Sequence, residues 1–551
     1  MDSAVVEATG LPITSASLPV PLTDLPAFQA DTKAASTPQA LAIPRALAVA
    51  LALSILTVGA VAVHGYHPFA EDAGIYIAGI KLALNPALYP ASTPFITAHT
   101  QLSIFSTFIA SLTRIAHLPL DYVLFTLYVA TTWLTLFGCW ALARRCFPLS
   151  HTARWSAVLL LASTLTLPIA GTSLFLMDPY LTGRSFSTPF ILLAICACLD
   201  RRPLLTVLAL AAAAAFHPLM AIYAAGFLLL LWAATERRWI TAAVLCSTAI
   251  ALGAALQFSQ RNVTESPAYL SAALTRSYFY LSAWQWYEWI GLAAPLLMML
   301  AYIRWQQLRP RTMRTAAPDL RIALSAACIL SGLTAIAVSA LFAHQASHSH
   351  LVARLQVLRM FHIIYLVFFV LLGGVFGQYA LKREAWRWAI SFTAIATTLF
   401  FVQRATYPAS THIEAPWREA HNPWTQAFLW IRGNTPVNAL FALDADYIYA
   451  PQEDTQGFRA VAERGSLADY SKDGGASAIF PQLAPAWAAQ HTATARLNTI
   501  TDAQRLQNLA PFHVTWLVLD RNAQTSFDCP YMNQSVKVCR LPQPPADTPA
   551  N

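Results

Sequence analysis

Charged residues are scarce in this chain. Asp, Glu, Lys and Arg make up 11% of its 551 residues, whereas 56% are hydrophobic and the mean hydropathy is +0.48. A soluble globular domain carries about 25% charged residues, so this composition excludes that class. The sequence indicates a protein that crosses a membrane several times.

Several sequence signatures of nucleotide and metal binding are also missing. The chain has no Walker-type glycine-rich loop, no zinc-type cysteine cluster, no dinucleotide fingerprint and no internal repeat. These absences argue against a nucleotide-driven pump, and we expect no nucleic-acid partner.

Long apolar runs recur from Ala46 to about Phe401. A span needs about 20 mostly apolar residues, and the first run is long enough to be a span rather than a signal peptide. The segment before it, residues 1–43, is rich in Ala, Pro, Ser and Thr, and we expect it to be a disordered cytoplasmic tail. We predict eleven spans, at residues 44–64, 120–142, 154–172, 187–200, 203–216, 218–235, 239–257, 286–304, 321–343, 360–380 and 387–405.

Arginines cluster between these spans. A cytoplasmic N-terminus would put all of the clusters inside, as the positive-inside rule favours. They are Arg144 with Arg145, Arg201 with Arg202, Arg237 with Arg238, and the runs that start at Arg304 and Lys382. The pair 203–216 and 218–235 is open to a second interpretation, because Pro218 also allows a single long or re-entrant segment.

The last part of the chain, residues 406–551, is richer in Pro, Asp, Gln and Asn. "NALFALDADYIYA", "HVTWLVLD" and "SVKVCRL" have the pattern of strands, and "NPWTQAFLWIRGN" that of a short helix with a glycine stop. We therefore predict an all-α polytopic membrane bundle over residues 44–405, followed by a small extracytoplasmic α/β domain.

Nine residues separate two cysteines in this tail. Cys529 and Cys539 would close a hairpin as a disulfide, which persists in oxidising compartments and agrees with an outer location. Two free thiols in a reduced domain are the alternative.

The predicted outer loops hold the unusual polar residues. The first loop, residues 65–119, is too amphipathic for ordinary spans and is typical of helices in the membrane interface. It contains Glu71 and Asp72, which would be either solvated or helix-capping residues, or a general base or ion ligand close to the membrane.

Other candidates lie in the later loops. Arg354 and Arg359 precede a span on the outer side, where topology does not favour positive charge, so they are candidates for binding phosphate. The aromatic stretch 278–289, with Trp286, is either an interfacial belt or a surface for stacking sugar or lipid. His217 is either a helix-end residue or part of a site, and a metal role for His344, His348 and His350 lacks a local carboxylate or cysteine.

The phrases "HPFAEDAGIYIAGIKLALNPALYP", "LMDPYLTGRSFSTP" and "FHPLMA" resemble a group of uncharacterised bacterial membrane proteins. Residues 60–405 also resemble, in arrangement, the GT-C class of membrane glycosyltransferases, which has about a dozen spans, interfacial helices in the first outer loop and an acidic catalytic residue soon after the first span. The acceptor-recognition signature of the oligosaccharyl transferases, and a second acidic motif in another outer loop, are missing.

The resemblance implies roles for particular residues. Asp72, or Glu71 beside it, would take the place of the first-loop acid, which deprotonates the acceptor or binds a divalent metal ion. The donor would be a sugar on a polyprenyl phosphate, whose leaving group needs a cation. The candidates for that cation are Arg184, Arg354, Arg359 and Lys81, and further site candidates in the matching phrases are His67 and Asp178.

The sequence therefore favours a glycosyltransferase that uses a polyprenyl-phosphate donor at the outer face of a bacterial inner membrane. A transporter or flippase for a lipid-linked glycan is the second hypothesis, although it would place charges near the bilayer midplane. A non-catalytic protein of polysaccharide assembly, with cell-envelope partners, is the third.

Overall fold

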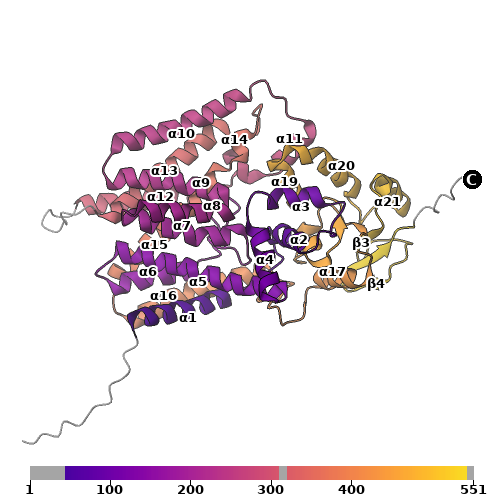
Figure 1. Cartoon of the computed structure of the whole chain (residues 1–551), viewed down its shortest axis with the longest axis horizontal. Helices are drawn as coiled ribbons and strands as arrows, with labels where there is room; N and C mark the ends of the chain where they lie inside the picture. Colours follow the sequence, from indigo (N-terminus) through magenta and orange to yellow (C-terminus); the bar gives the residue numbers. More distant parts are fainter. Residues whose placement is uncertain (1–43, 309–318, 543–551) are drawn as a thin grey trace, which may run out of the picture. The chain divides into compact units, whose positions relative to one another are not determined.

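The computed structural model describes residues 44–308 and 319–542 and is mostly helical (Figure 1). The predicted tail, residues 1–43, lies outside the described residues. The described residues from Ala50 onward form one compact unit.

Eight helices in the described part of the chain are long and apolar enough to cross a membrane. The chain is therefore a multi-pass membrane protein. The eight are α1 (Arg45–His64), α5 (Leu120–Cys146), α9 (Pro218–Thr235), α10 (Trp239–Ser259), α12 (Trp286–Leu308), α13 (Leu320–Phe342), the continuous segment Leu351–Leu381 that contains α15 (Phe361–Phe376), and α16 (Ala385–Thr406).

The predicted count of eleven spans is not confirmed, because three of the predicted spans are shorter helices. They are α6 (His151–Ser163), α7 (Gly183–Leu199) and α8 (Pro203–Phe216), and they pack among the longer ones. The span predicted at 154–172 is too long: α6 ends at Ser163, and the chain after it turns back so that Pro168 pairs with Phe175.

The chain reverses at His217. A Cβ atom added to Gly183, at the start of α7, would lie 2.5 Å from the carbonyl oxygen of Phe216, at the end of α8. Helices α7 and α8 are therefore antiparallel, and α8 and α9 are two helices rather than one long span. Ion pairs at the opposite ends join Arg145 to Asp200 and Arg201 to Glu236.

The first predicted outer loop contains three short helices. They are α2 (Ala73–Leu84), α3 (Thr93–Thr100) and α4 (Phe105–Ala116), and α3 and α4 meet at an angle of 94°. Figure 1 shows them between the long helices and the C-terminal region, which is residues 407–542. Because α2 packs against α18 (Phe458–Ala462) of that region, the first loop and the C-terminal region lie in direct contact.

The C-terminal region contains a five-stranded sheet with the order β2-β1-β3-β5-β4. Strand β1 is parallel to β2 and β3, whereas β5 is antiparallel to β3 and β4. The bounds are β1 (Leu440–Ala442), β2 (Gly465–Ser466), β3 (Trp516–Asp520), β4 (Tyr531–Met532) and β5 (Val536–Arg540). The predicted strands and helix are all present, with two corrections: the first strand stops at Ala442, and the helix α17 (Pro423–Asn434) ends one residue beyond Gly433.

Alternating side chains of β3 face two apolar clusters, as period-two burial requires. Trp516 and Val518 pack with Phe428 of α17, while Leu517 and Leu519 pack with Leu509 of α21 (Asp502–Leu509). Each face of the sheet is thus covered by helices.

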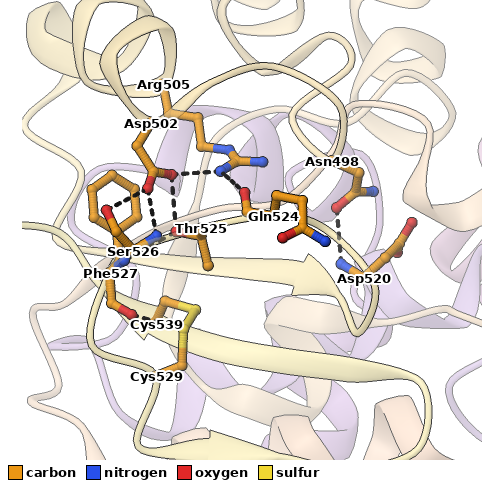
Figure 2. The surroundings of a disulfide bond; sticks show 10 residues. All are labelled: Asn498, Asp502, Arg505, Asp520, Gln524, Thr525, Ser526, Phe527, Cys529 and Cys539. Carbon is orange, nitrogen blue, oxygen red and sulfur yellow. Dashed lines mark hydrogen bonds and ion pairs between the residues drawn. A yellow bond between two sulfur atoms is a disulfide. The ribbon is translucent and has the colours of Figure 1, made fainter.

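The structure contains the disulfide between Cys529 and Cys539 (Figure 2). The loop before Cys529 is held by Asp502, whose carboxylate accepts hydrogen bonds of 2.9 Å from Thr525 Oγ1 and 2.8 Å from Ser526 Oγ. The disulfide and this carboxylate together fix the chain between β3 and β5.

Candidate functional site

Glu71 and Asp72 come just before α2 and point to different partners. Glu71 has a left-handed backbone with φ of 48° and donates its N–H to Gln456 Oε1 of the C-terminal region. Its carboxylate pairs with Lys472. Asp72 is the N-cap residue of α2, yet its side chain accepts no capping hydrogen bond, so the cap interpretation is wrong for Asp72.

Positive charges from separate segments surround the Asp72 carboxylate. Lys472 Nζ lies 3.7 Å from Asp72 Oδ1, and Arg184 and Arg359 are close enough to act on it electrostatically. Burial alone would raise the pKa of Asp72, but these cations outweigh it and lower the pKa to about 2. The side chain keeps 45% of its surface accessible. Asp72 is therefore an ionised carboxylate that a ligand can reach.

Asp178 and Arg184 form a buried ion pair at the start of α7. Arg184 Nη2 lies 2.6 Å from Asp178 Oδ2, and the two side chains are 7% and 3% exposed. Thr182 caps α7 in a capping box with Ser185. Burial raises the pKa of Asp178, although Arg184 opposes the shift. Asp178 Oδ1 is buried with no partner among the described residues, so one acceptor of this pair is unused.

Arg359 lies in the short turn η4 (Val357–Met360) that leads into α15. Its guanidinium carbon is 5.4 Å from the centre of the Tyr278 ring, and its buried Nε has no hydrogen-bond partner in the described chain. Within residues 44–308 and 319–542 no carboxylate lies within 4.0 Å of it. Arg359 is thus a cation near Asp72 that no direct ion pair neutralises.

Arg354 and Lys81 are engaged elsewhere. Arg354 donates through Nη1 to the carbonyl oxygen of Ile479 at 3.5 Å. Lys81 Nζ lies 2.7 Å from Glu463, so a phosphate would have to displace that carboxylate. Lys81 is also not among the cations that act on Asp72, so we do not include it in the proposed phosphate site.

The remaining predicted candidates have other surroundings. His67 Nδ1 lies 3.0 Å from Glu414, with its ring stacked on Tyr407. His217 accepts a hydrogen bond from the backbone N–H of Met220 at 3.4 Å and so caps α9. Trp286 is 73% exposed at the start of α12, which agrees with the interfacial-belt interpretation.

Two contacts with the outer histidines and carboxylates were not predicted from the sequence. Glu265, which comes 85 residues earlier in the chain, lies 2.6 Å from His350 Nδ1. Lys472 comes from a stretch about 400 residues after Glu71, reading "SKDGG", which has no recognisable motif. Both pairs depend on the tertiary fold.

A pocket opens beside the Glu71–Lys472 pair. It encloses about 460 Å³ of space not filled by atoms, open solvent included, between α2, α3 and the C-terminal region. Asp469 lies on its wall with Lys472, and burial together with the neighbouring Asp473 raises the pKa of Asp469. Asp72, Arg184 and Arg359 are not among its lining residues, so the pocket adjoins the site only at the Glu71–Lys472 pair.

The residues present do not fit a divalent metal ion. The described residues contain no group of three or more His, Cys, Asp or Glu side chains placed to hold one. Asp178 is engaged by Arg184, and the cations around Asp72 would repel a second positive charge. No step of the chemistry below depends on a metal.

No family model and no curated protein matches this chain. Among solved structures it is similar to the archaeal oligosaccharyltransferase AglB from Archaeoglobus fulgidus, in complex with an inhibitory peptide and a dolichol-phosphate. The TM-score is 0.43 at 12% sequence identity, over 86% of this chain and 69% of that one.

Proposed function

We propose that this protein is a membrane glycosyltransferase that transfers a sugar from a polyprenyl-phosphate donor to an acceptor hydroxyl. The observation that carries this proposal is the pairing of an accessible, ionised Asp72 with Arg359, a neighbouring cation without an ion-pair partner. Such a transfer needs a carboxylate that can take the proton of the acceptor hydroxyl. It also needs a cation, not already paired with a carboxylate, that can bind the phosphate leaving the donor.

In the proposed reaction, Asp72 accepts the proton of the acceptor hydroxyl. At the same time, the oxygen of that hydroxyl attacks the anomeric carbon of the donor sugar. The bond between that carbon and the phosphate oxygen breaks with inversion, and its electron pair remains on the phosphate. Arg359, with Arg184 behind it, stabilises the phosphate anion. Because the phosphate would neutralise the same cations that lower the pKa of Asp72, donor binding would raise that pKa and strengthen the base.

The orientation is part of the proposal. The arginine pairs after α5, α7 and α9 lie at the end of the helices opposite to Asp72, which supports a cytoplasmic location for them and an outer location for the site. The disulfide in the C-terminal region supports an oxidising compartment. We propose a bacterial inner membrane, a transmembrane domain at 44–405 and an extracytoplasmic domain at 406–551.

The test is sugar transfer by the purified protein in lipid vesicles. A labelled polyprenyl-phosphate sugar is supplied with a mixture of glycan and lipid acceptors, and released polyprenyl phosphate is measured with time. Transfer predicts release that depends on the acceptor. A flippase would move the labelled lipid across the bilayer without releasing phosphate, and an assembly protein would do neither. Absence of acceptor-dependent release over the full set of donors would contradict the proposal.

Arg359→Gln is expected to weaken the binding of a non-transferable polyprenyl-phosphate analogue by roughly tenfold, since a charge-assisted hydrogen bond contributes about 1.5–3 kcal/mol. Binding is measured by calorimetry or scintillation proximity in detergent. Arg387→Gln is the matched control, because Arg387 starts α16 at the opposite end and donates to the carbonyl oxygen of Ala380. Equal affinities for the Arg359 variant and the control would remove Arg359 from the phosphate site.

A further inference from the structure

One segment of the C-terminal region lies next to Asp72 and also contacts the stretch that precedes Arg359. Residues 469–479, which include α19 (Lys472–Ile479), contact α3 of the first loop, α11 (Pro267–Leu274) after α10, and α14 (Leu351–Arg354), which comes just before η4. Arg276 donates to the carbonyl oxygen of Ser471 at 2.9 Å, and Arg354 donates to that of Ile479 at 3.5 Å. Both ends of this segment are therefore held by loops of the membrane body.

Lys472 is the member of this segment that reaches Asp72. Its side chain is 15% exposed, and its Nζ pairs with Glu71 and lies 3.7 Å from Asp72 Oδ1. Burial alone would lower the pKa of Lys472, but the two carboxylates outweigh it and raise the pKa, so the amine stays charged. A buried ammonium between two carboxylates fixes the position of both.

The other charges behind Lys472 are already paired. Arg459 makes two hydrogen bonds of 2.7 Å to Asp473, whose Oδ2 also accepts the N–H of Asp469 at 3.0 Å. Asp469 Oδ1 accepts the backbone N–H of Lys472 at 2.5 Å. This network fixes the backbone from which Lys472 extends, and leaves its amine directed at the first loop.

We propose that Lys472 is a positioning residue, through which the C-terminal region orients the Asp72 carboxylate and keeps it ionised. Glu71 fixes the position of the Lys472 amine, and that amine orients the Asp72 carboxylate toward Arg184 and Arg359. The structural role stands on the ion-pair geometry alone, whereas its effect on transfer rests on the proposed function.

The test measures the protonation of Asp72 without any assay of transfer. A carbodiimide with an amine nucleophile modifies protonated carboxyl groups, and the rate at Asp72 is read at pH 5 by peptide mass spectrometry on the full-length protein. Lys472→Met is expected to raise that rate about tenfold, which is the change for one pKa unit. Lys472→Arg is expected to restore the slow rate. The charged and titratable groups that act on Asp72 in every variant are Arg184, Arg359, His99, Tyr76, Glu71 and Asp178.

Lys81→Met is the matched control, because it also removes an ion pair between the first loop and the C-terminal region. It is expected to leave the labelling of Asp72 unchanged. Labelling of the buried Asp178 reports misfolding. If the labelling of Asp178 rises in Lys472→Met, the rate at Asp72 is measured in Lys472→Gln instead. A rate at Asp72 within twofold of the wild type in the folded variant overturns the proposal.

Transfer gives the second measurement. Lys472→Met is expected to lower kcat about tenfold, with less than a threefold change in the KM of the donor, and Lys472→Arg is expected to recover most of kcat. A wild-type protein without transfer activity would refute the proposed function. The labelling experiment would still test whether Lys472 positions Asp72 and keeps it ionised. A loss in KM with kcat unchanged would overturn the positioning role.

Discussion

Asp72→Asn is expected to lower kcat for the proposed sugar transfer by roughly 10³-fold, the size expected for removal of a positioned general base. Asn has the shape of Asp but cannot accept the proton, and it no longer balances Lys472, Arg184 and Arg359. The affinity for the polyprenyl-phosphate donor is expected to stay equal or to rise, because a negative charge next to the phosphate has been removed. Single-turnover kinetics in vesicles, with binding measured separately, distinguish the two effects.

Glu71→Gln is the control for this variant. The Glu71 carboxylate pairs with Lys472, whose Nζ also lies 3.7 Å from Asp72 Oδ1, so the loss of Glu71 is expected to reduce kcat much less than the loss of Asp72. The thermal unfolding midpoint in detergent must stay near the wild-type value for both variants. Full transfer activity in Asp72→Asn would refute the proposed role of Asp72.

The pH profile of the proposed transfer by the wild-type protein gives a further check on the same carboxylate. An acid whose pKa is lowered is ionised above that pKa, so Asp72 would be available as the base at every pH above about 2. The acid limb of kcat/KM should therefore show no inflection near pH 4, where an ordinary aspartate titrates. In Lys472→Met the inflection caused by the titration of Asp72 is expected to move to higher pH.

The sequence was sufficient to predict the helical part of the fold to the extent that hydropathy controls it. All eight long helices lie at predicted spans, because a run of about 20 apolar residues matches the thickness of the hydrocarbon core. The 154–172 span was predicted too long because Leu165, Leu167 and Ile169 are as apolar as lipid-facing residues. In the structure Leu165 and Ile169 are buried in a turn against protein, and hydropathy cannot distinguish the two environments.

The site was predictable only on the side of the membrane body. Asp72, Arg184 and Arg359 stood out because charges are rare there, and the structure brings these three together. Lys472 was not predictable, because a lysine in a polar region is ordinary and its partners are about 400 residues away. Lys81 stood out for the same reason as the arginines, but its partner Glu463, 2.7 Å away, could not be predicted from the sequence.

Asp178→Asn is expected to destabilise the protein by about 3 kcal/mol, at the low end of the range for breaking a buried ion pair. Arg184 is 7% exposed and would lose the carboxylate 2.6 Å away, which leaves a buried charge without its direct partner. The cost falls at the low end because Asp72 lies close enough to compensate in part. The measurement is the free energy of unfolding in mixed micelles, or the shift in the thermal midpoint.

The double variant Asp178→Asn with Arg184→Met separates stability from function. Replacing both charges removes the unpaired cation, and such replacements of buried pairs are often neutral or stabilising. Stability should therefore return toward the wild-type value. Binding of the polyprenyl-phosphate analogue should stay weak, because Arg184 is one of the two proposed phosphate cations. A single Asp178→Asn variant as stable as the wild type would mean that Asp72 and water compensate Arg184 fully, and that the ion pair is not what holds the start of α7 in place.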